Sequence, residues 1–530
     1  MIGFYHGRIL LVIAATLCLA GAAWAEQIVP VNPPGSGNWV FDQPSAVVSG
    51  SVVHVAFVGD DTTGADSSPN TKLYYAAVNS GADFTNKATG RSQVLVTAPV
   101  AIDNSLVNFN NARHPVIALR SSTQLVILFQ AIPAGDTNHK LFRALVTIAG
   151  NAVTSQRVNE VQSPVSGRMA GNLTDPSFAL MATSTDNSLR VAYTDDSSGF
   201  GNVYYARVGM DNALLVGSAI LLSSQTSSRG VKPLPRLRLD SNNSHIVWAA
   251  NNSAGTPSPT GIYYAMVQNI PHTFTDNLAI GATQVLSGGY RWGFPSVFLT
   301  SSSSVWILAA DEPPIGSTGL AASVGIAEVN PKAVTLDGNP VSVNNVRSDS
   351  RFYLNPPGGS VLSSDFDAYQ PEADLDTQHR VHVSGYGFRG GPPLFQGTPG
   401  RYYAMALGTT AATAGITSVF ATMVGSPVSV GTGDLAFAVQ LPDDYTRPAF
   451  IRFSGKSIQF WSGQDNVVAG ARNLYVTSTF SPNDATKQSG CSMIDGTRGG
   501  EADRIPGAAV LLLPAGLLAL RKAIRKAFAR

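Results

Sequence analysis

Short apolar runs alternate with polar turns along most of the chain, and one order of runs recurs seven times. Each repeat begins with a proline, followed by an apolar run, a polar turn, a second apolar run, a loop and a third run. Runs of this length, rich in β-branched and aromatic residues and bounded by Ser, Asn, Asp and Gly, predict strands. We expect each proline to open the first strand, where its missing N–H costs least. The opening prolines, 59 to 77 residues apart, are Pro44, Pro115, Pro176, Pro235, Pro295, Pro371 and Pro448.

The third run of most repeats carries an aromatic pair followed by alanine. Adjacent side chains of a strand point to opposite faces of the sheet. We therefore expect one tyrosine of each pair to pack on the preceding repeat and the other on the next, as core residues and not as ligand-stacking residues. The pairs are Tyr74-Tyr75, Tyr204-Tyr205, Tyr263-Tyr264 and Tyr402-Tyr403, and the variants are 141–144, 324–327 and 474–476.

A fourth strand is expected after the third in most repeats, for example at 93–96, 284–286 and 427–430. The seventh repeat lacks one, but residues 27–31 resemble 93–97. The N-terminal segment is therefore predicted to complete the last sheet and close a ring without exposed edges. No stretch between the ends shows sustained helical periodicity. The expected fold is all-β, a seven-bladed β-propeller over residues 26–480.

The repeat resembles the blades of bacterial sialidase-like (BNR-type) propellers, and residues 235–248 with Ile262-Tyr263-Tyr264 match best. The resemblance covers about 430 residues and implies the scaffold. Two departures stand against carrying over catalytic residues: sialidases have six blades where seven repeats are present here, and their Ser-x-Asp-x-Gly-x-x-Trp turn motif is missing.

The N-terminus predicts a secretory signal peptide over residues 1–25. Arg8 precedes an apolar stretch at 9–22, and Ala23-Trp24-Ala25 forms a small-x-small cleavage site, with Ala25 the last residue of the signal. The alternative interpretation is an uncleaved membrane anchor.

The C-terminus predicts a linker with a Cys-containing motif at 481–504, a transmembrane helix at 505–520 and a basic tail at 521–530. Sixteen apolar residues are slightly short of the ~20 that span a bilayer, and basic residues after the span favour a cytoplasmic end. The order resembles bacterial sorting signals of the myxosortase type, which implies processing at Cys491. The alternative is an ordinary single-span anchor.

Composition narrows the class of protein. The two cysteines, Cys18 and Cys491, lie in the terminal segments, so the body has no disulfide and depends on its core. The whole chain carries a net charge of +1, but residues 26–490 hold 27 basic and 31 acidic residues, a charge near −4. This charge argues against nucleic acid as a partner.

Antiparallel pairing predicts where a site would lie. The start of the first strand, the end of the second and the start of the third should meet on one face around a central channel, with long loops at 60–71, 249–261 and 385–400. Loops on one face of a rigid scaffold commonly carry function. The charged and aromatic residues predicted to bind a ligand there are Asp60, Asp61, Arg113, His114, Asp195, Asp196, Arg291, Asp311, Glu312, Tyr369, Glu372 and Arg447.

Mixed acids and arginines at a channel mouth suit an anionic sugar, a peptide or a metal ion, because arginine binds carboxylates through two hydrogen bonds and paired carboxylates can hold Ca²⁺. The alternative is that Asp and Asn are present because they satisfy turn backbones. The zinc-protease, nucleophile-elbow, P-loop and EF-hand motifs are missing from the sequence, and no metal is assigned. His54 and His245 each lie ten residues after a proline and are interpreted as structural.

Three functions follow from these features. The first is an exported propeller that is anchored at a bacterial cell surface or outer envelope and binds a glycan or protein ligand at the channel mouth. Its other expected partners are the export machinery and a C-terminal sorting protease. The alternative is a glycan-active enzyme, a sialidase-like hydrolase or a lyase. The third is a structural envelope protein.

Overall fold

The computed structural model divides the chain into two compact units, Met1–Ala485 and Thr486–Arg530. The described residues all lie in the first unit, within 29–480. Inside that span the description is interrupted at 35–38, 62–69, 83–90, 103–108, 151, 183–185, 198–200, 224–232, 252–259, 271–275, 287–291, 302, 312–322, 335–339, 346–365, 376–380, 390–397, 408–417, 425–448, 454–455 and 465–471. The predicted signal peptide, Cys491, the predicted transmembrane segment and the basic tail lie outside the described residues. Among the residues that are described, no helix is long and apolar enough to cross a membrane.

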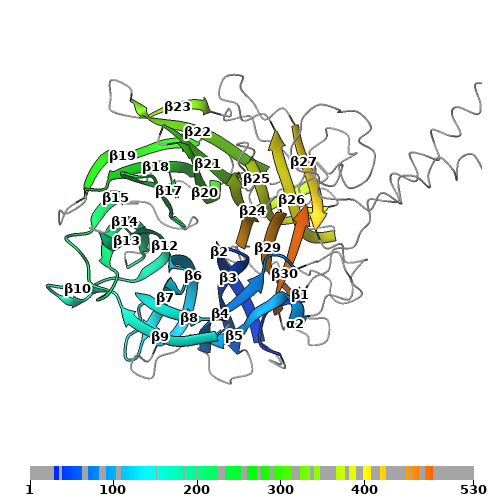
Figure 1. The fold of residues 1–530 in the computed structure, drawn as a ribbon. Coiled ribbons are helices and arrows are strands. Elements are labelled where there is room, and N and C mark those ends of the chain that lie inside the picture. Colours follow the sequence, from blue (N-terminus) through cyan, green and yellow to red (C-terminus); the bar gives the residue numbers. More distant parts are fainter. Residues whose placement is uncertain are drawn as a thin grey trace, which may run out of the picture. The chain divides into compact units, whose positions relative to one another are not determined.

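The described strands build antiparallel meanders, in which each strand pairs with the next along the chain (Figure 1). A parallel bridge between Val40 and Arg472 also joins the first and last meanders in one eight-stranded sheet. The first two meanders are β2 (Trp39–Ser49), β3 (Val52–Asp61), β4 (Asn70–Asn79) and β5 (Leu95–Ala101), then β6 (Phe109–Ser121), β7 (Gln124–Pro133), β8 (Lys140–Ala149) and β9 (Ala152–Glu160). The third and fourth are β12 (Leu173–Ala182), β13 (Asn187–Asp195), β14 (Asn202–Gly209) and β15 (Ile220–Ser223), then β16 (Arg236–Leu239), β17 (Asn243–Asn251), β18 (Thr260–Gln268) and β19 (Asn277–Leu286).

The remaining meanders follow the same order. They are β20 (Trp292–Ser301), β21 (Ser304–Asp311), β22 (Ser323–Val334) and β23 (Pro340–Asn345), then β24 (Phe366–Leu375), β25 (Val381–Arg389), β26 (Thr398–Leu407) and β27 (Ser418–Val424), and last β28 (Ala449–Phe453), β29 (Lys456–Gln464) and β30 (Arg472–Phe480). Two further elements are a short hairpin of β10 (Gln162–Ser163) and β11 (Gly167–Arg168) and a helical turn, α2 (Arg91–Val94). The all-β prediction is therefore confirmed for the described residues, apart from this one turn.

The N-terminal segment completes the last meander, as predicted. β1 (Val29–Pro30) pairs antiparallel with β30, with Val29 opposite Val476, and Val31 N–H donates to the Leu474 carbonyl at 2.7 Å. Arg91 of α2 donates to the carbonyl of Val31 at 3.3 Å and also to the carbonyl of the next residue. The first meander thus holds the strand that closes the seventh.

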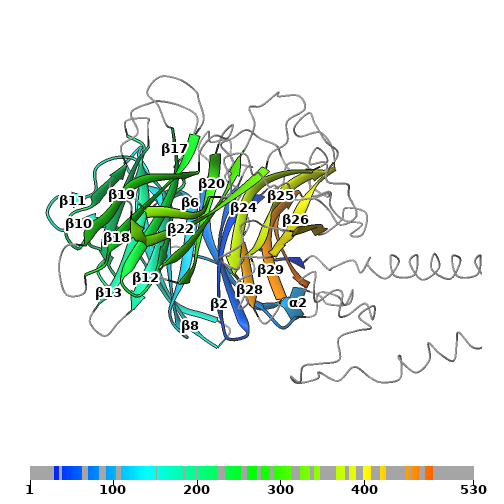
Figure 2. The same ribbon diagram turned by 90° about the horizontal axis from the view of Figure 1, so that it is seen from above.

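The first strands contact one another in a closed order: β2, β6, β12, β16, β20, β24, β28 and again β2. They surround a common centre, with the later strands of each meander farther out (Figure 1). Seen from the side, the strands run across the unit, so their ends gather on two faces (Figure 2). The fold of this unit is all-β and β-propeller-like.

The aromatic pairs pack as predicted. Tyr74 belongs to a core cluster shared with β28–β30, whereas Tyr75 belongs to a cluster shared with β6–β8. In the same way, Tyr263 packs against the cluster between the third and fourth meanders and Tyr264 lies in the one between the fourth and fifth. Tyr204 and Tyr205 do the same, so each of these three pairs joins its own meander to both neighbours, while the side chains of Tyr402 and Tyr403 lie outside the described residues.

Three details of the prediction were wrong. Five of the prolines do not open their strands but lie inside them at register shifts, because a bulge removes the need for the proline N–H: Pro44, Pro115, Pro176, Pro295 and Pro371. The fourth strand expected at 93–96 begins at Leu95, because 91–94 form the helical turn. The sixth meander ends with β27 at 418–424, and 427–430 lie outside the described residues.

A buried polar cluster lies between the third and fourth meanders. Arg190 is fully buried and pairs with Asp186 at 2.6 Å and with Asp276 at 3.2 Å. Arg207 pairs with the same two carboxylates at 3.1 and 3.6 Å, and the Tyr205 hydroxyl donates to Asp276 at 2.6 Å. Two arginines and two aspartates thus balance each other's charge, as burial of ions requires.

Candidate functional site at the central pocket

The strand ends meet as the antiparallel argument predicts. In the first meander Val40 of β2 lies opposite Asp60 of β3, which lies opposite Thr71 of β4. The same three-strand level holds Asp195 in the third meander and Asp311 in the fifth. As predicted, Asp60, Asp195 and Asp311 stand at or next to the ends of second strands. Most of the loops predicted at 60–71, 249–261 and 385–400 lies outside the described residues.

The residue before the opening proline adopts an unusual conformation in five repeats. Its φ is positive, between 45° and 51°, although a following proline restricts the backbone of a non-glycine residue. Such residues cost of order 1–3 kcal/mol each and persist where the surroundings hold them. These five residues are Gln43, His114, Asp175, Leu234 and Phe294.

Two glutamine side chains hold two of these backbones. Gln43 Oε1 accepts a hydrogen bond from His114 N–H at 2.7 Å, and Gln130 Oε1 accepts one from Asp175 N–H at 2.6 Å. At His114 and Asp175, the register shift and this hydrogen bond together hold the backbone that carries the side chain. Strain of this kind clusters at functional sites, and here it lies beside a cavity.

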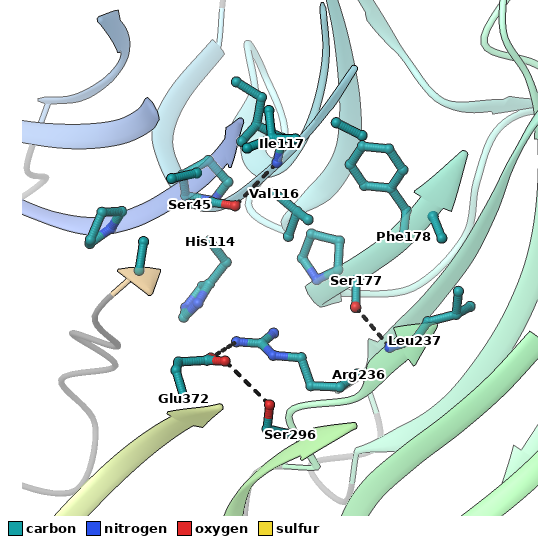
Figure 3. Close-up of a pocket in the computed structure, with 18 of the residues that line it drawn as sticks. Ser45, His114, Val116, Ile117, Ser177, Phe178, Arg236, Leu237, Ser296 and Glu372 are labelled. Atoms are coloured by element: carbon teal, nitrogen blue, oxygen red, sulfur yellow. Dashed lines mark hydrogen bonds and ion pairs between the residues drawn. The ribbon is translucent and has the colours of Figure 1, made fainter. Parts of the chain in front are cut away.

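A pocket of about 450 Å³ lies at the centre of the ring of first strands. Every first strand, from β2 to β28, contributes residues to its wall, and Figure 3 shows many of them. Two side-chain pairs stand in it: His114 Nε2 lies 3.5 Å from Asp175 Oδ1, and Arg236 Nη2 lies 3.3 Å from Glu372 Oε1 in an ion pair. Ser296 Oγ donates to the other Glu372 oxygen at 3.4 Å. We call Gln43, His114, Asp175, Arg236, Ser296 and Glu372 the pocket mouth.

Serines after the prolines fasten neighbouring first strands. Ser45 Oγ accepts from Ile117 N–H at 3.2 Å, and Ser177 Oγ accepts from Leu237 N–H at 3.0 Å. Each serine belongs to one meander and the N–H to the next. The wall of the pocket is therefore rigidly spaced, which helps to preorganise the groups that it carries.

Exposure distinguishes the two side-chain pairs. The side chains of Arg236 and Glu372 are 27% and 19% exposed, while those of His114 and Asp175 are 16% and 5% exposed. The more exposed pair is the one that a ligand in the pocket can reach first. Figure 3 shows the His114 ring directed toward the Arg236–Glu372 pair.

The structure brings two of the predicted site residues, His114 and Glu372, into this pocket. Other predicted residues have partners outside its lining: Arg113 Nε donates to Asn111 at 2.7 Å, Asp195 accepts from Asn172 N–H at 3.2 Å, and Asp196 accepts from Thr174 Oγ1 at 2.9 Å. Asp60 and Asp61 are the last two residues of β3. Asp311 is the last residue of β21, and Tyr369 lies within β24. Arg291, Glu312, Arg447, Ala25 and Cys491 lie outside the described residues.

Four mouth residues were missed by the sequence analysis: Gln43, Asp175, Arg236 and Ser296. They share one signal, because each stands immediately before or after an opening proline. Three charged neighbours of prolines, His114, Glu372 and Arg447, were predicted to lie at the channel, but the same positions of the other repeats were not considered. The register shifts next to Pro44, Pro176 and Pro295 cannot be predicted from hydrophobic periodicity.

The structural interpretation of His54 and His245 is supported by matching contacts. His54 Nδ1 lies 2.8 Å from the Tyr75 hydroxyl, and His245 Nδ1 lies 2.8 Å from the Tyr264 hydroxyl. Burial lowers the pKa of His54 to about 4. Within the part of the chain that the structure describes, no group of three or more His, Cys, Asp or Glu residues could hold a metal ion.

Comparisons with known proteins give matches to solved structures. No family model and no curated protein matches the chain. An endo-arabinanase of glycoside hydrolase family 43 from Bacillus licheniformis is 12% identical, with 57% of this chain and 97% of that chain covered and a TM-score of 0.29. A family 43 enzyme from Xanthomonas citri is 13% identical (63% and 98% covered, TM-score 0.31). A protein of unknown function from Dyadobacter fermentans is 11% identical (85% and 97% covered, TM-score 0.41). Likeness at this level does not identify the ligand of this chain.

Proposed function

We propose that the protein is directed at a glycan and binds a sugar in its central pocket. The observation that carries the proposal is the mouth itself, where two side-chain pairs, a serine and a glutamine face one cavity of about 450 Å³. Sugar hydroxyls both donate and accept hydrogen bonds, so they match carboxylates beside a guanidinium. The volume lies within the range of about 300–1,000 Å³ typical of small-molecule sites.

The balance of charge favours a hydroxyl-rich ligand. Arg236 is paired with Glu372, and His114 with Asp175, so neither carboxylate faces the pocket without a cationic or hydrogen-bonding partner. A ligand that is itself uncharged can bind beside such pairs without leaving a buried charge uncompensated. A glycan fits this requirement better than a nucleic acid or a metal ion.

Binding of a glycan array by the purified full-length protein tests the proposal. Glu372→Gln and Arg236→Gln should each weaken binding by about 10-fold or more, since hydrogen bonds to charged groups contribute roughly 1.5–3 kcal/mol. Asp211→Asn is the matched control, because this carboxylate is 70% exposed and stands outside the pocket. If no glycan binds, or if binding survives both mouth variants, the proposal is wrong and a protein ligand or a structural role takes its place.

Glycan hydrolysis is the second candidate function, and one observation favours it. Two carboxyl groups, Asp175 and Glu372, line the same pocket from different meanders, and most glycoside hydrolases use a pair of carboxyl groups on either side of the scissile bond. Release of reducing sugar by the wild type, and its loss in Asp175→Asn and Glu372→Gln, would establish an enzyme. Binding without turnover would establish a binding module.

We infer further that the seven meanders are the blades of one seven-bladed propeller, closed by β1. The closed order of first-strand contacts and the pairing of β1 with β30 support this count. An electron-density map of the full-length protein tests it by counting the blades around the channel.

We also propose that the protein is exported and anchored at a bacterial surface. The support comes from the sequence: Ala23-Trp24-Ala25 before Glu26, and Cys491 before an apolar run and a basic tail. Sequencing of the mature N-terminus should begin at Glu26. Cys491→Ser should leave the C-terminal segment attached if a sorting protease acts there, and an unchanged mature mass would oppose this role.

A further inference from the structure

One arginine in the wall of the central pocket has no carboxylate partner. Among the described residues, five side chains that can carry a charge line the pocket: His114, Asp175, Arg236, Arg238 and Glu372. Four of them form the two side-chain pairs of the pocket mouth. In the described part of the chain, the guanidinium of the fifth, Arg238, has neither an ion pair nor a hydrogen bond. The lining therefore holds one cation that contacts no carboxylate.

The direction of the Arg238 side chain follows from its neighbours on β16. Leu237 lies in the buried cluster between the third and fourth meanders, and Leu239 packs against it. Adjacent side chains of a strand point to opposite faces, so Arg238 points away from this cluster, to the same side as Arg236. Arg236 contacts Glu372 in the pocket, and Arg238 lines the same pocket. One ligand can therefore contact both arginines.

The two arginines differ in what they offer to a ligand. Two residues of strand at about 3.3 Å each separate their Cα atoms by about 6–7 Å. Arg236 already binds Glu372 and is 27% exposed, whereas Arg238 is exposed and its donors are open to a ligand. The planar fork of a guanidinium binds a carboxylate or a tetrahedral oxyanion through two parallel hydrogen bonds. Arg238 is therefore suited to an anionic substituent beside the group that contacts the mouth.

We infer that the ligand of this pocket is an acidic glycan, with hydroxyl groups at the pocket mouth and a carboxylate or sulfate ester on Arg238. The inference rests on the proposed glycan binding and adds the charge of the ligand. The paired groups of the mouth receive uncharged hydroxyls, while the anionic substituent binds the cation that contacts no carboxylate. The molecule as a whole opposes an anion, because residues 26–490 carry a charge near −4. A preference for acidic glycans must therefore come from a local site.

Binding of matched glycans tests this inference with the full-length protein. The array carries neutral oligosaccharides beside the same oligosaccharides oxidised to uronates or bearing a sulfate ester. The acidic member of a pair should bind about 10-fold tighter, as expected for charge-assisted hydrogen bonds. The uronate and sulfate arms identify which anion the site prefers. Added salt should reduce the preference, because Arg238 is exposed to solvent.

Two variants of Arg238 locate the anion. Arg238→Gln should remove the preference for acidic members while neutral members bind as they do to the wild type. Arg238→Lys keeps the charge but loses the planar fork, so it should retain part of the preference. Arg157→Gln is the matched control, because Arg157 is exposed on the outer strand β9 and does not line the pocket. Should Arg238→Gln fail to fold, an unchanged preference in Arg238→Lys overturns the assignment and a reduced one supports it.

The outcomes separate this inference from the function beneath it. Equal binding of neutral and acidic members would overturn the acidic ligand and leave glycan binding intact. A preference that survives in Arg238→Gln, or that Arg157→Gln also removes, would overturn it too, because the preference would then not come from this arginine. Failure of every glycan to bind would overturn the glycan function and this inference together. A preference that Arg238→Gln removes and Arg157→Gln preserves supports it.

Discussion

Arg236 on β16 and Glu372 on β24 form an ion pair at 3.3 Å although the first strand of another meander, β20, lies between theirs in the ring. Ser296 on β20 donates to the same carboxylate. Three consecutive meanders are therefore joined at the pocket mouth by one carboxyl group. This arrangement makes Glu372 the residue whose loss should affect most of the mouth at once.

Arg236→Gln should change ligand binding much more than stability. The pair is partly exposed, and such pairs contribute about 0–1 kcal/mol to the free energy of unfolding. We expect urea denaturation to show a loss within that range and glycan binding to fall about 10-fold or more. A double-mutant cycle with Glu372→Gln measures the coupling. A large loss of stability with unchanged binding would show that the pair is structural.

Substitutions in the buried cluster between the third and fourth meanders should change stability much more than ligand binding. Asp276→Asn leaves Arg190 and Arg207 with one carboxylate, and removal of one partner from a buried ion pair typically costs about 3–5 kcal/mol. Urea denaturation should therefore show a large loss, whereas Asp211→Asn, at a 70% exposed carboxylate, should show almost none. Equal effects of the two variants would contradict the role given to the cluster.

Stability should fall as the pH drops from about 6.5 toward 4. Burial holds the pKa of His54 at about 4 in the folded protein, and burial also lowers the pKa of His245, partly opposed by Asp240. An unfolded histidine has a pKa of about 6.5, so in this window the unfolded chain binds more protons and acid favours unfolding. The free energy of unfolding measured against pH should flatten there in the double variant His54→Gln/His245→Gln. An unchanged slope would contradict the assignment.

Carboxyl groups affect the stability at a lower pH than the two histidines do. Burial would raise the pKa of Asp186, but hydrogen bonds from Arg190 and Ser188 outweigh it and leave this pKa below its usual value. Its contribution to stability should therefore be complete above about pH 4 and be lost as the pH falls farther. In Asp186→Asn, the wild-type loss of stability below about pH 4 should be smaller.

Arg91→Ala should loosen the closure of the ring. Arg91 donates to the carbonyls of Val31 and Asn32, and Asn32 bonds to Asn473 at 2.9 Å. Loss of these contacts should speed hydrogen exchange at the β30 amides that face β1, with a loss of about 1–3 kcal/mol. Arg157→Ala, at an exposed position of β9, is the control. Faster exchange throughout the unit would mean general destabilisation instead of local opening.

The sequence repeat predicts the scaffold well because its signal is local. The order of strands, the packing of Tyr74 and Tyr75 on opposite neighbours and the closing role of residues 29–31 follow from strand periodicity and the repeat alone. The side-chain pairs in the pocket cannot be predicted from strand periodicity. Arg236 and Glu372 are 136 residues apart in sequence, and their side chains meet across the first strand of another meander. Likewise, after a four-residue insertion Arg190 stands opposite Arg207, at the position where the first and fourth repeats have His54 and His245. Strand periodicity does not predict a buried ion cluster there.

The register shifts at Pro44, Pro115, Pro176, Pro295 and Pro371 separate two kinds of position. The tyrosine pairs and the alternating apolar residues join the meanders, while the residues directly before and after the proline face the cavity. Several positions of the second kind also join neighbouring meanders, because Gln43, Ser45 and Ser177 accept hydrogen bonds from backbone N–H groups of the next meander. The same short segments therefore determine both which groups the cavity presents to a ligand and how neighbouring first strands are spaced.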